Sequence, residues 1–111
     1  MIEINAHSVQ EAGKDVIRAV KSFRAGLHDT ARSWIDAAYE RLYEESKWCA
    51  EGREEVQRFL NFVVGIKLNV LKLSDLDLSI PASMIYFGRK DADAFKVEIE
   101  KQVNDFVEAS A

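Results

Sequence analysis

Apolar side chains recur through most of the chain at spacings of three and four residues, which is the period of an amphipathic helix. The first such stretch is predicted to be a helix over residues 9–26. Its apolar positions, which share one helical face, are Val9, Ala12, Val16, Val20, Phe23 and Leu27. Ser8 and Glu11 have the spacing of a capping box at the start of this helix, and Gly26 lies at its end.

The same period returns in a second stretch, which we predict to be a helix over residues 30–51. Asp29 or Thr30 is expected to cap it, and Gly52 is expected to end it. Its apolar face is formed by Ala31, Trp34, Ile35, Ala38, Leu42 and Cys49. On the outer face, two pairs at i,i+4 spacing are expected to form ion pairs, namely Arg32 with Asp36 and Arg41 with Glu45.

The most apolar part of the chain lies between residues 59 and 73. Its polar side chains are only Asn61, Lys67, Asn69 and Lys72. A helix over residues 54–73 would therefore be apolar around most of its circumference, which predicts that other elements bury it on several sides. Gly65 lies inside this helix, where glycine is unfavourable, and we expect the first or second helix to approach closely at that point.

Residues 74–90 fit two interpretations. Leu76, Leu78 and Ile80 alternate with polar residues, as in a strand. A proline early and a glycine late, at Pro81 and Gly88, instead favour a short helix, which is the interpretation that we prefer. A last helix is predicted over residues 91–109, with a stripe formed by Phe95, Ile99, Val103, Phe106 and Val107.

Together these elements predict a mainly α protein. At 111 residues the chain has room for one hydrophobic core, so we expect one helical domain over residues 1–111. The domain would have four helices, of which the one at 54–73 is central and the other three pack around it. A short irregular or two-stranded element is expected near 76–87. The alternative is an α+β fold with a small sheet that includes residues 1–5, where Ile2 and Ile4 alternate with polar residues.

Charge and cysteine content narrow the functional classes. The net charge is −4, whereas binding to nucleic acid usually needs a basic surface. The overall charge therefore argues against a nucleic-acid-binding protein. Cys49 is the single cysteine, which favours a reducing compartment; we expect its thiol to be buried and unreactive. The apolar run is too short to span a bilayer. We therefore expect a cytoplasmic protein without membrane contact.

The clearest candidate binding feature is a basic stripe on the first helix. Continued to residue 28, this helix would place four basic side chains on an arc opposite its apolar face; these are Lys14, Arg18, Lys21 and His28. Such a stripe is suited to an acidic partner or a polyanion. More often, such a stripe is a solvated helix face, in which Glu11 and Asp15 pair with Lys14 and Arg18.

A second candidate is the pair Tyr39 and Tyr43, which lie one turn apart on the second predicted helix. Tyrosine side chains on a partly exposed face are typical of protein interfaces. They would also fit an arrangement in which they pack against the segment at residues 74–90 and direct their hydroxyl groups to water.

The sequence contains no arrangement of residues that identifies an enzyme. Asp75 and Asp77 follow an apolar run and in this resemble the aspartate pair of haloacid-dehalogenase-type phosphotransferases, which implies Mg²⁺-dependent chemistry. That motif belongs to the first strand of a much larger domain, so we expect no such activity here. His7 and His28 have no cysteine partners at zinc-site spacing. No metal and no cofactor are expected.

These observations favour a small, non-catalytic cytoplasmic binding protein, such as a regulator, adaptor or inhibitor. It would act through contact with a larger macromolecule, which we expect to be a protein. The alternative is binding of nucleic acid or another polyanion through the basic stripe. Formation of a homodimer is a further expectation, because the last two predicted helices carry more apolar surface than the first two would cover.

Overall fold

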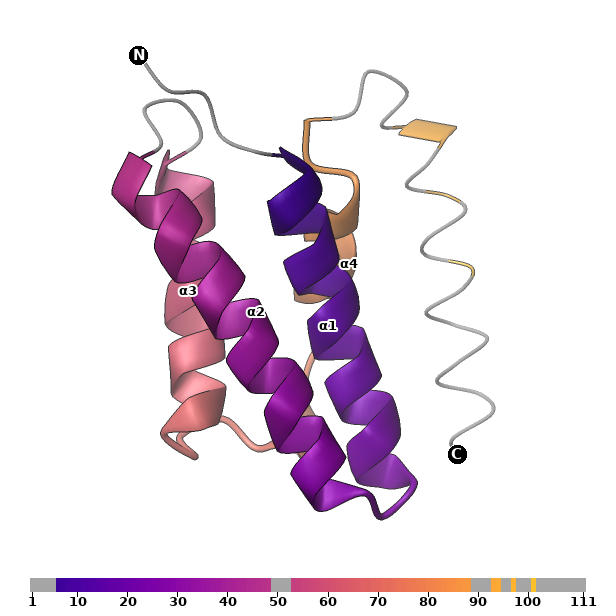
Figure 1. The fold of residues 1–111 in the computed structure, drawn as a ribbon. Helices are drawn as coiled ribbons and strands as arrows, with labels where there is room; N and C mark the ends of the chain where they lie inside the picture. Colours follow the sequence, from indigo (N-terminus) through magenta and orange to yellow (C-terminus); the bar gives the residue numbers. More distant parts are fainter. Residues whose placement is uncertain (1–5, 49–52, 89–92, 95–96, 98–100, 102–111) are drawn as a thin grey trace.

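The computed structural model describes residues 6–48, 53–88, 93–94, 97 and 101 (Figure 1). In these ranges the chain is mainly helical, as predicted, and residues 76–87 contain no strand. The elements are α1 (Ala6–Arg24), α2 (His28–Trp48), α3 (Arg53–Lys67), the 3₁₀ turn η1 (Leu73–Asp75) and α4 (Ser79–Ile85). Among the described residues, no helix has both the length and the hydrophobicity needed to cross a bilayer.

The helices form two layers. Figure 1 shows α1 and α2 side by side in front, with α3 behind α2 and α4 behind α1. The most extensive helix contact is that between α1 and α2, while α3 packs on α2 and α4 packs on α1. The middle of the described bundle is therefore the α1–α2 pair, and α3 lies to one side of it. This differs from our expectation of a central third helix, because α3 packs mainly on α2 while α4 packs on α1.

The predicted apolar faces do form the core. The largest cluster of buried residues comprises Val9, Ala12, Val16, Ala19, Ala31, Ile35, Ala38, Leu42, Val56, Phe59, Leu60, Val63 and Ile66. Phe23 and Trp34 are only partly buried, and Leu27 is exposed. The helical period thus identified the buried positions of α1 and α2 well, and failed mainly at the ends of their faces.

α1 and α4 meet at a glycine. A Cβ atom added to Gly13 would lie 2.7 Å from the carbonyl oxygen of Pro81 and 3.0 Å from Cγ1 of Ile85. Gln10 Nε2 also donates a hydrogen bond of 2.7 Å to the carbonyl of Phe87, just beyond α4. The close approach that we expected at Gly65 therefore occurs at Gly13 instead, because a residue without a Cβ lets the α4 backbone lie on α1.

At Gly65 no helix in the described part of the chain makes the expected contact. What lies against this residue is the side chain of Leu71, whose Cδ1 atom would be 3.0 Å from an added Cβ. Leu71 belongs to the segment that follows α3. The glycine therefore makes room for the chain as it leaves the helix, and it does not mark a crossing of two helices.

The predicted end of the third helix at residue 73 was wrong, because α3 ends at Lys67. Asn69 adopts a left-handed conformation with φ of 60°, and its N–H donates to the carbonyl of Ile66. The N–H of Val70 donates to the carbonyl of Gly65. These two bonds form a Schellman motif, in which the last carbonyls of a helix are satisfied and the chain turns away.

The predicted starts of the first two helices were also too late. α1 begins at Ala6, so Ser8 lies within its first turn and does not cap it. α2 begins at His28, and the N–H of Ala31 donates to the carbonyl of Leu27, so neither Asp29 nor Thr30 is the cap. Alanine favours a helix strongly, and Asp29 is favourable within a first turn because of the helix dipole.

Within residues 76–87 the preferred short helix is confirmed as α4, and the two-stranded alternative was wrong. Asp77 Oδ1 accepts hydrogen bonds from the backbone N–H and the hydroxyl of Ser79 at the start of α4. The strand at 1–5, Cys49 and most of the helix at 91–109 lie outside the described residues. Within that last range, residues 93–94, 97 and 101 are helical.

Candidate partner-binding groove

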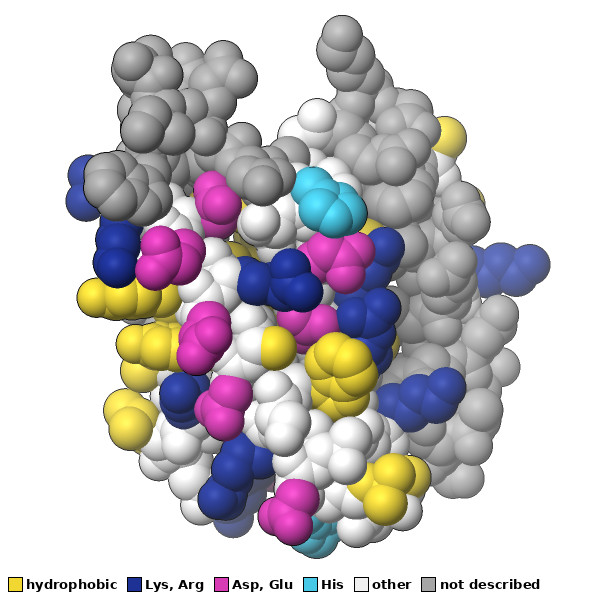
Figure 2. Space-filling view, in the orientation of Figure 1, with side chains coloured by type: hydrophobic (Ala, Val, Ile, Leu, Met, Phe, Trp, Pro, Cys, Tyr) yellow, Lys and Arg dark blue, Asp and Glu magenta, His cyan; other side chains and the backbone are white. Residues whose placement is uncertain are grey.

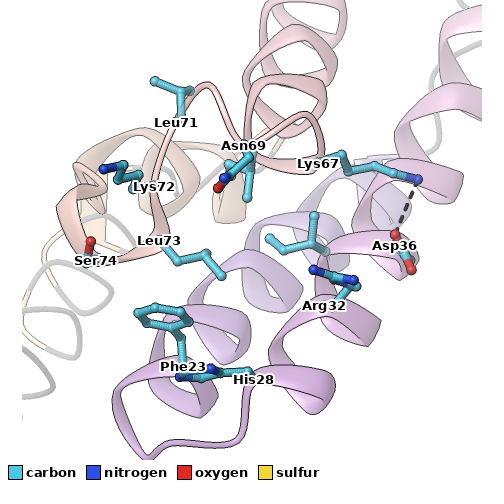
Figure 3. Close-up of a pocket in the computed structure, with 12 residues that line it drawn as sticks. Phe23, His28, Arg32, Asp36, Lys67, Asn69, Leu71, Lys72, Leu73 and Ser74 are labelled. Carbon is cyan, nitrogen blue, oxygen red and sulfur yellow. Dashed lines mark ion pairs between the residues drawn. The ribbon is translucent and has the colours of Figure 1, made fainter.

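A groove of about 560 Å³ lies where the end of α1, the start of α2 and the segment after α3 meet (Figure 3). Pockets for ligands in proteins have volumes of about 300–1,000 Å³. Its lining comprises Phe23, His28, Arg32, Ile35, Asp36, Ile66, Lys67, Asn69, Leu71, Lys72, Leu73 and Ser74. Because α3 ends at Lys67, residues 69–74 form one wall of the groove and do not continue the helix.

Part of the groove is apolar, and so is the surface beside it. Figure 3 shows Leu73 directed from the wall segment toward the stacked rings of Phe23 and His28. Leu68 and Val70, which flank the turn at the end of α3, are 70% and 75% exposed. We expected both to be buried in a longer helix. Side chains of this size in water are favourable to bury against a partner.

The charged side chains of the groove are mostly basic. Arg32, Lys67 and Lys72 line it together with a single carboxylate, that of Asp36. Asp36 forms an ion pair of 3.2 Å with Lys67. The predicted pair of Arg32 with Asp36 was therefore wrong, because the carboxylate is directed across to α3.

Arg32 and Lys72 are exposed cations. Neither forms a hydrogen bond or an ion pair with any residue in the described part of the chain. Figure 3 shows Arg32 between the Lys67–Asp36 pair and the Phe23–His28 stack. The groove thus has positive charge that is available to a ligand.

His28 belongs to this groove and not to a stripe on α1. α1 ends at Arg24, and His28 is the first residue of α2. Its ring stacks on that of Phe23, with ring centroids 4.6 Å apart. The expectation that four basic residues share one helix was therefore wrong, because Gly26, with φ of 83°, turns the chain before residue 28.

The three remaining residues of the predicted stripe lie on α1, and two of them bind acidic neighbours. Lys14 Nζ is 3.4 Å from Oε1 of Glu11, and Arg18 is 3.0 Å from Oδ1 of Asp15. Lys21 is exposed. Figure 2 shows basic and acidic side chains interspersed over α1 and α2, without a broad surface of one sign in that view.

Asp15 is fully buried between α1 and α2. Its other carboxylate oxygen accepts a hydrogen bond of 3.0 Å from Nε of Arg41, and the guanidinium of Arg18 lies over the ring of Trp34. Burial raises the pKa of the Asp15 carboxyl above its ordinary value, against the opposing effects of Arg41 and Arg18. The two arginines therefore compensate a buried charge, and this is a structural role.

Tyr39 and Tyr43 lie one turn apart on α2 and stack on one another at a centroid distance of 5.8 Å. Each ring also contacts a lysine: Lys67 Nζ is 4.2 Å from the centroid of Tyr39, and Lys47 Nζ is 4.5 Å from that of Tyr43. Tyr39 is partly buried, whereas Tyr43 is 44% exposed. Cation–π contacts thus occupy both rings.

The described residues contain no group of three or more histidine, cysteine, aspartate or glutamate side chains that could hold a metal ion. Asp75 and Asp77 are exposed. The hydrogen bonds from Ser79 hold the pKa of Asp77 below its ordinary value. Asp77 thus contributes to the start of α4.

Apart from His28, the residues that form the groove were missed by the sequence patterns. The signal that could have located it is Asn69, since asparagine often takes the left-handed position after a helix. With the helix ended there, Leu68 and Val70 would no longer be expected on a buried face. That Arg32 has no acidic partner among the described residues could not be predicted, because it depends on the direction of the Asp36 side chain, which pairs with Lys67.

Comparisons of the chain with protein-family models, with curated proteins and with solved structures give no match. The function is therefore argued from the geometry and chemistry of the groove.

Proposed function

We propose that the protein is a non-catalytic binding protein that uses the groove and its apolar edge to contact a larger protein. The observation that carries this proposal is the position of Leu68 and Val70, which are largely exposed directly beside the groove. Apolar residues that are clustered and exposed mark interaction sites more often than scattered ones do. A regulator, adaptor or inhibitor acts in this way.

The composition of this surface also supports a protein partner. Protein interfaces combine an apolar centre with a polar rim, and aromatic residues and arginine are enriched in them. Here the groove lining combines the apolar side chains of Phe23 and Leu73 with the cationic side chains of Arg32 and Lys72. The single cysteine of the chain favours a reducing compartment, so we place this contact in the cytoplasm.

The proposal is tested by site-specific photo-crosslinking in host cells. A photo-reactive amino acid is placed at Val70 or Ser74, on the groove side, and at Arg58 as the control. Arg58 is exposed on α3, and it is not a lining residue. We expect both groove positions to capture the same protein, identified by mass spectrometry, and the control position not to capture it. Identical products from all three positions, or none, would contradict the proposal.

A second copy of this chain is a competing partner for the same surface. Analytical ultracentrifugation of the purified protein distinguishes the two, because a homodimer would dissociate in the variant Leu68→Ser/Val70→Ser. The polyanion hypothesis has less support, since Lys14 and Arg18 already bind Glu11 and Asp15. It predicts a gel shift with nucleic acid at low salt that Lys21→Glu weakens.

A further inference from the structure

We infer that the occupant of the groove is an acidic segment of the partner protein that also carries large apolar side chains. This inference rests on the proposed function, and it adds the chemical class of the ligand. It follows from three properties of the groove, which are its uncompensated charge, its apolar lining and its unused hydrogen-bonding groups.

The first property is charge. The whole chain has a net charge of −4, yet the groove has three cationic side chains, Arg32, Lys67 and Lys72, against the carboxylate of Asp36. Arg32 and Lys72 have no acidic partner among the described residues. An acidic ligand can therefore bind them without breaking an existing ion pair. Charge complementarity of this kind raises the association rate and selects against basic partners.

The second property is the apolar lining, which argues against a ligand that is only a polyanion. Phe23 and Leu73 line the groove and are only partly buried, and a phosphate chain would offer them no apolar group. They and the exposed Leu68 and Val70 gain stabilisation only when apolar groups replace the water beside them. A ligand that uses both parts of the groove must combine carboxylates with apolar side chains.

The third property is a pair of polar side chains in the wall segment. The amide of Asn69 and the hydroxyl of Ser74 line the groove, and neither side chain has a hydrogen-bond partner within the described residues. Both can donate a hydrogen bond to a carboxylate or a peptide carbonyl. The peptide backbone of a partner segment supplies such acceptors.

The inference is tested by fluorescence anisotropy with a short labelled peptide in which glutamates alternate with leucines and phenylalanines. A matched peptide has glutamine in place of each glutamate, and a third has serine in place of each apolar residue. We expect the full-length protein to bind the first peptide at least about tenfold more tightly than either of the others.

The variant Arg32→Glu/Lys72→Glu should weaken binding of the first peptide by about tenfold or more. The matched control is Lys47→Glu/Arg58→Glu, which changes the net charge equally but alters cations that pair with Glu44 and Glu54 away from the groove. It should change the affinity by no more than about twofold. Thermal unfolding monitored by circular dichroism verifies that both variants fold.

Equal binding of the glutamate and glutamine peptides overturns the acidic ligand and leaves the proposed function standing, because the groove would then bind an apolar segment. Equal loss in the two charge variants also overturns the inference, since only the net charge would then matter. If the serine peptide binds as well as the first, the ligand is a simple anion and the inference is wrong. Absence of binding together with absence of cross-linking at Val70 removes the proposed function as well.

Discussion

Two regions along α1 and α2 contain arginines, and they differ in what those arginines contact. Near the middle of the helix pair, Arg18 and Arg41 bind the buried carboxylate of Asp15. At one end of the pair, Arg32 has no acidic partner in the described part of the chain. All three side chains carry the same charge, but the charge of Arg18 and Arg41 is already paired with the carboxylate of Asp15. The availability of charge therefore depends on the acidic neighbours and not on the number of basic residues.

The energetic reason for this difference is burial. Arg18 and Arg41 cannot move to a partner without leaving Asp15 charged and uncompensated in the core, which costs several kcal/mol. Arg32 is exposed, and its side chain is already hydrated. Moving it onto a carboxylate of a partner costs side-chain entropy and part of its hydration, but it leaves no buried charge uncompensated. The first region thus represents a structural use of arginine and the second, under the proposed function, a binding use, and the following predictions test this comparison.

The largest expected effect is that of Arg41→Gln on stability. This change removes one of the two cations that contact the buried carboxylate of Asp15, and we expect it to lower the free energy of unfolding by roughly 2 kcal/mol. Arg32→Gln is the matched control and should change it by less than about 0.5 kcal/mol. Urea unfolding at neutral pH measures both. Equal losses in the two variants would contradict the distinction between the regions.

A second prediction concerns pH. The pKa of Asp15 is raised in the folded protein above its ordinary value of 3.8, so the folded state binds a proton more tightly than the unfolded state does. The contribution of this group to stability is therefore greatest in acid and falls as the pH rises from the unfolded pKa through the folded one. Relative to Asp15→Asn, the wild-type protein should lose stability over that window.

Arg41→Gln sharpens this pH prediction, because Arg41 is the strongest of the influences that lower the pKa of Asp15. In the variant Arg41→Gln the pKa of Asp15 should therefore be higher than in the wild type. The stability of this variant should then fall, relative to Arg41→Gln/Asp15→Asn, up to a higher pH. Urea unfolding at a series of pH values provides the measurement. If the free energy of unfolding of the wild type instead increased relative to that of Asp15→Asn with rising pH, the prediction would be contradicted.

A smaller effect is expected for Asp36→Asn. Its carboxylate is half-exposed in the pair with Lys67, so the change should cost less than about 1 kcal/mol of stability. It also removes the only acidic side chain among the described residues that line the groove, and binding of the acidic peptide should therefore tighten a few-fold. Weaker binding in this variant, measured by anisotropy, would show that the pair itself forms part of the contact.

The smallest change in stability is expected for Leu68→Ser/Val70→Ser. Both side chains are mostly in water, so the free energy of unfolding should change by less than about 0.5 kcal/mol. Binding of the acidic peptide should nevertheless weaken, because its apolar side chains lose their contacts. A large loss of stability would mean that these residues pack more closely than their exposure indicates.

The helical period predicted most of the core, since Val16, Ile35 and Leu42 are all buried where it placed them. The ends of the elements were less predictable. A run such as that from Phe59 to Leu73 keeps its apolar character whether or not the helix continues, and the backbone geometry of Asn69 decides where it stops. A hydrophobic pattern therefore fixes which face is buried more reliably than where that face ends.

The groove was less predictable still, because it depends on contacts between distant parts of the chain. Local spacing favoured a pair of Arg32 with Asp36, but α3 brings Lys67 to Asp36. Local spacing also placed Arg18 on a solvated face beside Asp15, without indicating that α2 buries this carboxylate and adds Arg41. Both outcomes required the packing of one helix on another.

The most direct test of the account is an NMR titration that follows the side-chain Nε–H resonances of the arginines during addition of the acidic peptide. We predict that the resonance of Arg32 shifts with peptide concentration, while those of Arg18 and Arg41 stay in place because Asp15 retains them. Shifts of Arg18 and Arg41 with an unmoved Arg32 would contradict the account, since the available charge would then lie on the face of α1 and not at the groove.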